Sequence, residues 1–135
     1  MFIPVIQDLI KNVSTQIPVD VQEALVQAQK NELPHSNGDL TLSVILENIN
    51  LASCKKTPIC QDTGFPTFYV KLPYAKSQGQ ESFRLQKQLE NDIISAVEKS
   101  TAQGILRPNA VDGLTGKNSG NNTGIHQPKI YFEDL

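Results

Sequence analysis

Cysteine and aromatic residues are scarce in this sequence, and neither sign of charge dominates it. There are two cysteines and no tryptophan, and aromatic residues make up 6% of the chain. Two cysteines are too few for a disulfide scaffold, which favours a reducing compartment and a cytoplasmic location. The 12 basic and 14 acidic residues give a formal net charge of -2. Because this balance leaves no basic stripe for phosphate groups, we expect no nucleic-acid partner.

Long hydrophobic runs are also missing. The apolar stretch over residues 1–13 is interrupted by Pro4 and Asp8, so it fits neither a signal peptide nor a membrane-spanning helix. We therefore expect no attachment to a membrane. The chain does have 135 residues, 39% of them hydrophobic, which is enough for one domain with a mainly aliphatic core.

Helical periodicity is present through the first half and returns near residue 80. The second predicted helix opens at Asp20, which is expected to be its N-cap. The Asn37-Gly38 pair is expected to form a turn, and Gly104 is expected to stop the last helix. The apolar stripe of that last helix comprises Phe83, Leu89, Ile93, Ile94 and Val97. The predicted helices cover residues 5–13, 20–30, 40–53 and 81–103.

Strand-like alternation of apolar and polar residues occurs twice. Residues 67–72 predict one half-buried strand, and a polar turn, "AKSQGQ" at 75–80, follows it. The closing "PKIYFEDL" indicates a second strand. Because the sequence stops inside this pattern, we expect a domain that is cut or that completes itself on another chain. The predicted fold is a mixed, helix-rich α+β arrangement of amphipathic helices and a small β-sheet.

The segment "LRPNAVDGLTGKNSGNNTG", residues 106–124, contains four glycines and four asparagines but almost no apolar residues. It is expected to be a long loop that contributes nothing to the core. Part of it is similar to a phosphate-binding loop. The pattern G-x-x-x-x-G-K-[ST] nevertheless fails twice, because Val111 replaces the first glycine and Asn118 follows Lys117. Nucleotide binding is therefore disfavoured.

The stretch "TPICQDTGFP", residues 57–66, places a thiol beside an amide, a carboxylate and a hydroxyl. Pro58 ends any helical continuation, so Cys60 is expected on a loop. Gln61, Asp62 and Thr63 then offer polar groups next to a candidate ligand or nucleophile. Two structural alternatives stay open: Cys60 could be a small buried hydrophobe, and the Asp-Thr-Gly run could be an ordinary Asx-turn.

Other residues are weaker candidates. Arg107 precedes a proline and the glycine-rich loop, where its guanidinium could hold a carboxylate at two points, although a surface salt bridge is the alternative. Cys54, near a helix end, is interpreted as structural, and its separation from Cys60 does not suit a zinc site. His35 and His126 lie in polar loops and are expected to be solvated.

Taken together, "PICQDTG" and "LRPNAVDGLTGKNSGNNTG", with the "IPVDVQEAL" stretch before them, resemble the class I, iron-sulfur fumarate hydratase and L-tartrate dehydratase family. The resemblance covers nearly the whole chain and points to the N-terminal part of the alpha catalytic region. It implies a hydro-lyase acting on a small dicarboxylic acid, most simply the conversion of fumarate to L-malate in the tricarboxylic acid cycle. L-tartrate is the alternative substrate.

The resemblance also assigns roles to residues. Cys60 matches the first of three cysteines that hold a 4Fe-4S cluster, whose open iron acts as a Lewis acid. Gln61 and Asp62 match substrate-binding positions, with Asp62 also catalytic through proton transfer, and Arg107 matches a carboxylate-binding arginine. On this basis the chain divides into four regions. They are a helical region at residues 1–56, a cluster-ligand loop with a strand at 57–72, a long helix at 81–103 and a substrate loop at 104–128.

The chain also departs from the family pattern. Gly113 stands where a proline is usual, and Asn121 stands where an acidic residue is usual. Two further cluster cysteines are required and Cys54 matches neither, so the cluster is expected to need sequence outside this chain. The expected partners are the remainder of the alpha region, a beta domain or subunit, and a second copy in a homo-oligomer. A non-catalytic structural or dimerisation module of the same fold remains the alternative.

Overall fold

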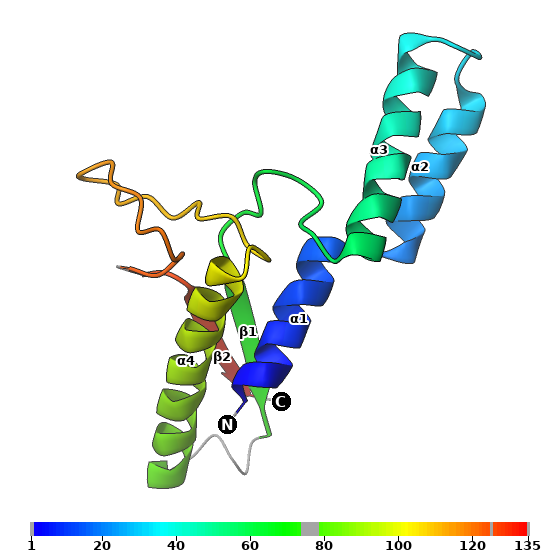
Figure 1. Cartoon of the computed structure of the whole chain (residues 1–135). Helices are drawn as coiled ribbons and strands as arrows, with labels where there is room; N and C mark the ends of the chain where they lie inside the picture. The colour runs from blue at the N-terminus through cyan, green and yellow to red at the C-terminus, as the bar shows by residue number, and fades with distance from the viewer. Residues whose placement is uncertain (1, 74–78, 125, 135) are drawn as a thin grey trace.

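The computed structural model describes residues 2–73, 79–124 and 126–134 of the chain. Helices make up most of the described part, and a small sheet accompanies them (Figure 1). The predicted helix-rich α+β fold is therefore confirmed. The elements are α1 (Ile3–Thr15), α2 (Val19–Asn31), α3 (Asn37–Lys55), β1 (Thr67–Leu72), α4 (Gly79–Ala102) and β2 (Lys129–Asp134).

The sheet consists of β1 and β2, which pair in parallel with Thr67 opposite Lys129. Helix α4 lies between these strands in the sequence, as a parallel connection requires. Phe68 and the alternate residues of β1 are at least half-buried, whereas Tyr69 and Tyr131 are exposed and stack with their ring centroids 5.2 Å apart. Both predicted strands are confirmed, and the expected alternation is present in each.

The core lies where α1 packs against α4 (Figure 1). Its buried residues are Ile10, Ala96, Val97 and Leu106. Leu106 belongs to the segment that was expected to contribute nothing to the core, and that expectation is wrong. Gly104, at φ 73°, turns the chain back after α4, and the N–H groups of Ile105 and Leu106 both donate to the Ser100 carbonyl. This return places Leu106 over the core.

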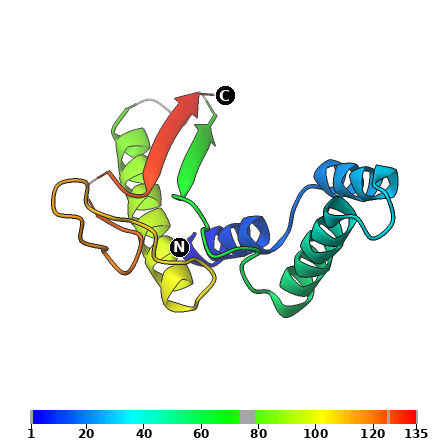
Figure 2. The ribbon, with the colours of Figure 1, turned by 90° about the horizontal axis from the view of Figure 1, so that it is seen from above.

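Helices α2 and α3 form a hairpin that projects away from the rest of the molecule (Figures 1 and 2). Two predictions for it are wrong. Asp20 is not the N-cap, because α2 already begins at Val19 after Pro18 and has no side-chain cap. The Asn37-Gly38 pair is not a turn, because Ser36 caps α3 by accepting the N–H of Asp39 at 3.1 Å. A satisfied cap allows the helix to start earlier than its apolar pattern does.

Helix α4 agrees with prediction in place and in most of its buried face. Ile93 and Val97 are buried, but Phe83 is 71% exposed, so its assignment to the apolar stripe is wrong. The helix begins at Gly79, and residues 75–78 of the predicted turn lie outside the described residues. In the described part of the chain, no helix is both long and apolar enough to cross a membrane.

Candidate active site

The loop that carries Cys60 is tied to two helices. The carbonyl of Ile59 accepts a hydrogen bond from the side-chain amide of Asn48 on α3 at 2.7 Å. The N–H of Ile59 donates to the backbone carbonyl of Ser14 on α1 at 3.1 Å. Beyond this anchor the Cys60 thiol is exposed and donates to the carbonyl of Asp62 at 2.7 Å. The alternative in which Cys60 is buried packing material is therefore wrong for this structure.

Asp62 is held by its own loop. Its Oδ1 atom accepts the N–H of Gly64 at 2.8 Å, which is the Asx-turn that the sequence left open. Gly64 has a φ of 69°, a conformation that glycine adopts at little cost. Gln61 and the Asp62 side chain both face solvent. The turn orients the carboxylate and leaves it accessible.

The segment from Arg107 to Ala110, called the Arg107 segment below, lies directly against the Cys60 loop, although Arg107 is 44 positions after Thr63 in the sequence. The backbone N–H of Arg107 donates to the Thr63 hydroxyl at 3.0 Å. The side-chain amide of Asn109 donates to Oδ1 of Asp62 at 2.9 Å and lies 3.4 Å from the Thr63 hydroxyl. The two stretches singled out from the sequence are thus neighbours. Arg107 is exposed and forms no ion pair with a carboxylate among the described residues.

A buried asparagine, Asn122, supports the Arg107 segment from beneath. Its side chain is 0% exposed. The Oδ1 atom accepts the N–H groups of Asn109 at 2.8 Å and Ala110 at 3.1 Å, and Nδ2 donates to the carbonyl of Arg107 at 2.7 Å and to Thr101 at 3.0 Å. Sequence reasoning missed this residue. Its only signal was its place in a run of polar residues, which does not separate a buried asparagine from exposed ones.

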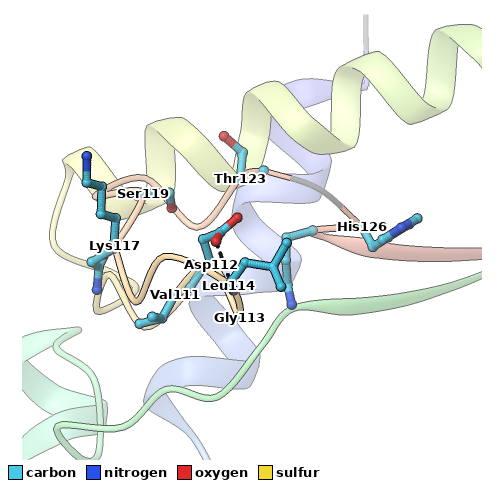
Figure 3. Close-up of a pocket in the computed structure, with 12 residues that line it drawn as sticks. Val111, Asp112, Gly113, Leu114, Lys117, Ser119, Thr123 and His126 are labelled. Atoms are coloured by element: carbon cyan, nitrogen blue, oxygen red, sulfur yellow. Dashed lines mark hydrogen bonds between the residues drawn. The ribbon is translucent and has the colours of Figure 1, made fainter.

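The remainder of the loop encloses a hollow of about 660 Å³ lined by residues between 110 and 127 (Figure 3). On its rim Asp112 accepts hydrogen bonds from the N–H and hydroxyl of Thr115 and from the N–H of Leu114. These bonds, the Thr115 N–H first, hold the pKa of Asp112 below its usual value. Figure 3 shows Lys117 and His126 directed away from each other. They do not converge on one ligand.

The remaining candidates lie on the surface. His35 and His126 are exposed, as predicted, and Cys54 is exposed near the end of α3. The described residues contain no group of three histidine, cysteine, aspartate or glutamate side chains that could hold a metal ion. With two cysteines in the sequence and one of them at this site, the chain by itself does not fit a complete 4Fe-4S cluster. At this site the chain offers one thiol, that of Cys60.

Comparison with known proteins gives the class of this chain. Residues 3–133 match the model of the fumarate hydratase (Fumerase) family. The match spans both motif segments and all the helices of the described residues, so the chain belongs to the fumarate hydratase family.

Individual relatives point in the same direction. The chain is 41% identical over 125 residues to a Geobacillus stearothermophilus protein described as a class I fumarate hydratase. It is 34% and 32% identical to proteins of Methanocaldococcus jannaschii and Escherichia coli K12 described as L(+)-tartrate dehydratase subunit alpha. These alignments cover 93%, 96% and 90% of this chain but 23%, 43% and 37% of the respective relatives. The chain therefore spans less than half the length of these relatives.

Proposed function

We propose that this chain supplies one part of the active site of a hydro-lyase that adds water to, or removes it from, a small dicarboxylic acid. The carrying observation is the pair of hydrogen bonds that joins the Cys60 loop to the Arg107 segment, from Arg107 N–H to Thr63 at 3.0 Å and from Asn109 to Asp62 at 2.9 Å. The segments that carry a thiol, a carboxylate and a guanidinium are neighbours through these bonds, and Cys60, Asp62 and Arg107 are each exposed.

Each residue has a distinct part in this proposal. Arg107 pairs with one substrate carboxylate, and Gln61 donates or accepts a further hydrogen bond. Asp62 exchanges the proton on the carbon next to the one that carries the hydroxyl. Cys60 provides one of three thiolates for a 4Fe-4S cluster, which when bound would supply Lewis-acid chemistry. The other two thiolates come from sequence outside this chain.

Fumarate, hydrated to L-malate, is the favoured substrate because the relative at 41% identity is described as a fumarate hydratase. L-tartrate is the second candidate, because two other relatives are described as tartrate dehydratase alpha subunits. Those names also support partnership with a beta domain or subunit, together with the rest of the alpha region. We further propose a homo-oligomeric assembly in the cytoplasm.

The test uses the chain assembled with those alpha and beta parts and reconstituted without oxygen with iron and sulfide. We expect hydration of fumarate or dehydration of L-tartrate, rapid inactivation in air, and loss of turnover in Cys60→Ser. Cys54→Ser is the matched control, because Cys54 is also an exposed thiol but lies on α3. This substitution should leave turnover unchanged. Unaltered turnover in Cys60→Ser would refute the ligand assignment.

The isolated chain provides a complementary experiment. Reconstituted alone, it should bind no stable cluster, because one thiolate at the site cannot replace three. A stoichiometric brown chromophore on the isolated chain would contradict the proposal that the cluster is shared with other sequence.

A further inference from the structure

We propose that Asn109 is a positioning residue that holds the Asp62 carboxylate in one orientation, with Oδ2 presented to the ligand. This inference rests on the proposed function and adds to it a residue that contacts Asp62 rather than the substrate. The contact is direct, because the Asn109 side-chain amide donates to Oδ1 of Asp62 at 2.9 Å.

The two oxygen atoms of Asp62 are not equivalent. Oδ1 accepts two hydrogen bonds, from Gly64 N–H at 2.8 Å and from Asn109, whereas Oδ2 accepts none from the described residues. A terminal carboxylate otherwise rotates in a broad, roughly two-fold torsional well. With Oδ1 engaged twice on one side, Oδ2 is the oxygen that the described residues leave to a ligand.

Asn109 is itself held in place. Its backbone N–H donates to the buried Oδ1 of Asn122 at 2.8 Å, and Asn122 also accepts the N–H of Ala110. These bonds fix the backbone of Asn109 from the side opposite the solvent. A rigid supporting residue is what an acid-base group needs, because misplacement by about 1 Å can cost roughly a hundredfold in rate.

The position of Asn109 also separates its role from that of Arg107. Asn109 is half-buried beneath the loop, whereas Arg107 is exposed. Loss of the Asn109 amide should therefore disturb proton transfer more than substrate binding. The predicted signature is a fall in kcat with little change in KM.

The first experiment measures hydrogen exchange by NMR on the 135-residue chain. Asn109→Ala should speed exchange of the Gly64 amide by about five- to tenfold, because its acceptor is no longer held. Asn121→Ala is the control, since its side chain bonds to Glu98 and to the Thr123 N–H rather than to Asp62. Unchanged Gly64 exchange in Asn109→Ala would overturn the proposal.

The second experiment uses the assembled enzyme. Asn109→Ala should lower kcat by about 10- to 100-fold while KM changes less than about threefold. A normal kcat, or a rise in KM alone, would overturn the positioning role even if Gly64 exchange increased. An inactive wild-type assembly would instead refute the proposed function, and this outcome is visible before any variant is made.

An exchange of the two side chains tests whether Oδ1 of Asp62 is the acceptor that Gly64 and Asn109 share. Asn109→Asp places two carboxylates against each other and should speed Gly64 exchange. In the double variant Asp62→Asn with Asn109→Asp, one atom at the Oδ1 position cannot both accept the Gly64 N–H and donate to a carboxylate at position 109, so Gly64 exchange should stay fast and turnover should stay lost. Recovery of turnover in the double variant would contradict the assignment of Asp62 as the oriented group.

Discussion

The side chain of Asn122 donates a hydrogen bond to the carbonyl of Arg107 across 2.7 Å, from a position with no exposed surface. This contact links the proposed substrate-binding segment to the interior. It makes the glycine- and asparagine-rich loop an anchored structure, and it gives the first of four predictions.

Replacing Asn122 should strongly destabilise the chain. Asn122→Ala removes four hydrogen bonds and leaves buried N–H and carbonyl groups unsatisfied, so we expect the free energy of unfolding to fall by about 2–4 kcal/mol. Urea denaturation of the chain would measure this. Asn31→Ala, at an exposed helix end, should change the same quantity by less than about 0.5 kcal/mol.

The left-handed backbone of Asn122, at φ 60°, also contributes to that loss. Asn122→Gly relieves the backbone strain of alanine but still lacks the side chain. We therefore expect glycine to be less destabilising than alanine and still well below wild type. Equal stability of Asn122→Gly and wild type would show that the four hydrogen bonds contribute nothing.

The core between α1 and α4 predicts a contrast between two valines. Val97 is 0% exposed and Val13 is 72% exposed, and both lie in helices. Val97→Ala should lower the free energy of unfolding by about 2 kcal/mol through lost packing, whereas Val13→Ala should leave it nearly unchanged. Thermal or urea unfolding of both variants makes the comparison. Equal effects would contradict the packing of α1 on α4.

The end of α3 predicts opposite effects for two neighbouring lysines. Lys56 follows the helix with φ 54° and ψ 43°, in the left-handed region, whereas Lys55 is the last helical residue. Lys56→Gly should raise the free energy of unfolding by about 1 kcal/mol. Lys55→Gly should lower it by up to about 1 kcal/mol because glycine disfavours the helix. A loss of stability in Lys56→Gly would contradict this C-cap conformation.

Asp112 predicts a local response to acid. Hydrogen bonds from Thr115 and Leu114 hold its pKa below the usual value of 3.8. A carboxylate with a lowered pKa stabilises the folded turn fully above that usual value, and the contribution is lost as the pH falls through the folded pKa. Protection of the Thr115 amide, corrected for its intrinsic exchange rate, should therefore decrease in acid.

Asp112→Asn supplies the control for this measurement. The amide oxygen of asparagine can still accept a hydrogen bond but has no proton to gain in this range. The corrected Thr115 protection should be constant with pH in the variant. A parallel acid-dependent loss in both proteins would show that another group is responsible.

Local patterns determined much of this fold. The alternation of residues 67–72 and the helical spacing through α4 depend only on side chains two to four positions apart, so they could be interpreted without tertiary information. Helix starts were less predictable. At Ser36 a cap and an apolar stripe indicate different first residues, and the hydroxyl that accepts the Asp39 N–H decides between them.

The sequence by itself also identified Cys60, Asp62 and Arg107 as unusual, because their functional groups and flanking turn residues are local features. Only the tertiary structure brought the side-chain amide of Asn109 within 2.9 Å of Oδ1 of Asp62, 47 positions earlier in the sequence. It also buried Asn122 beneath the Arg107 segment. A polar loop has no hydrophobic period to indicate which side faces inward. Which side faces inward depends on the backbone N–H and carbonyl groups, because these need hydrogen-bond partners once the chain turns back over the core at Gly104.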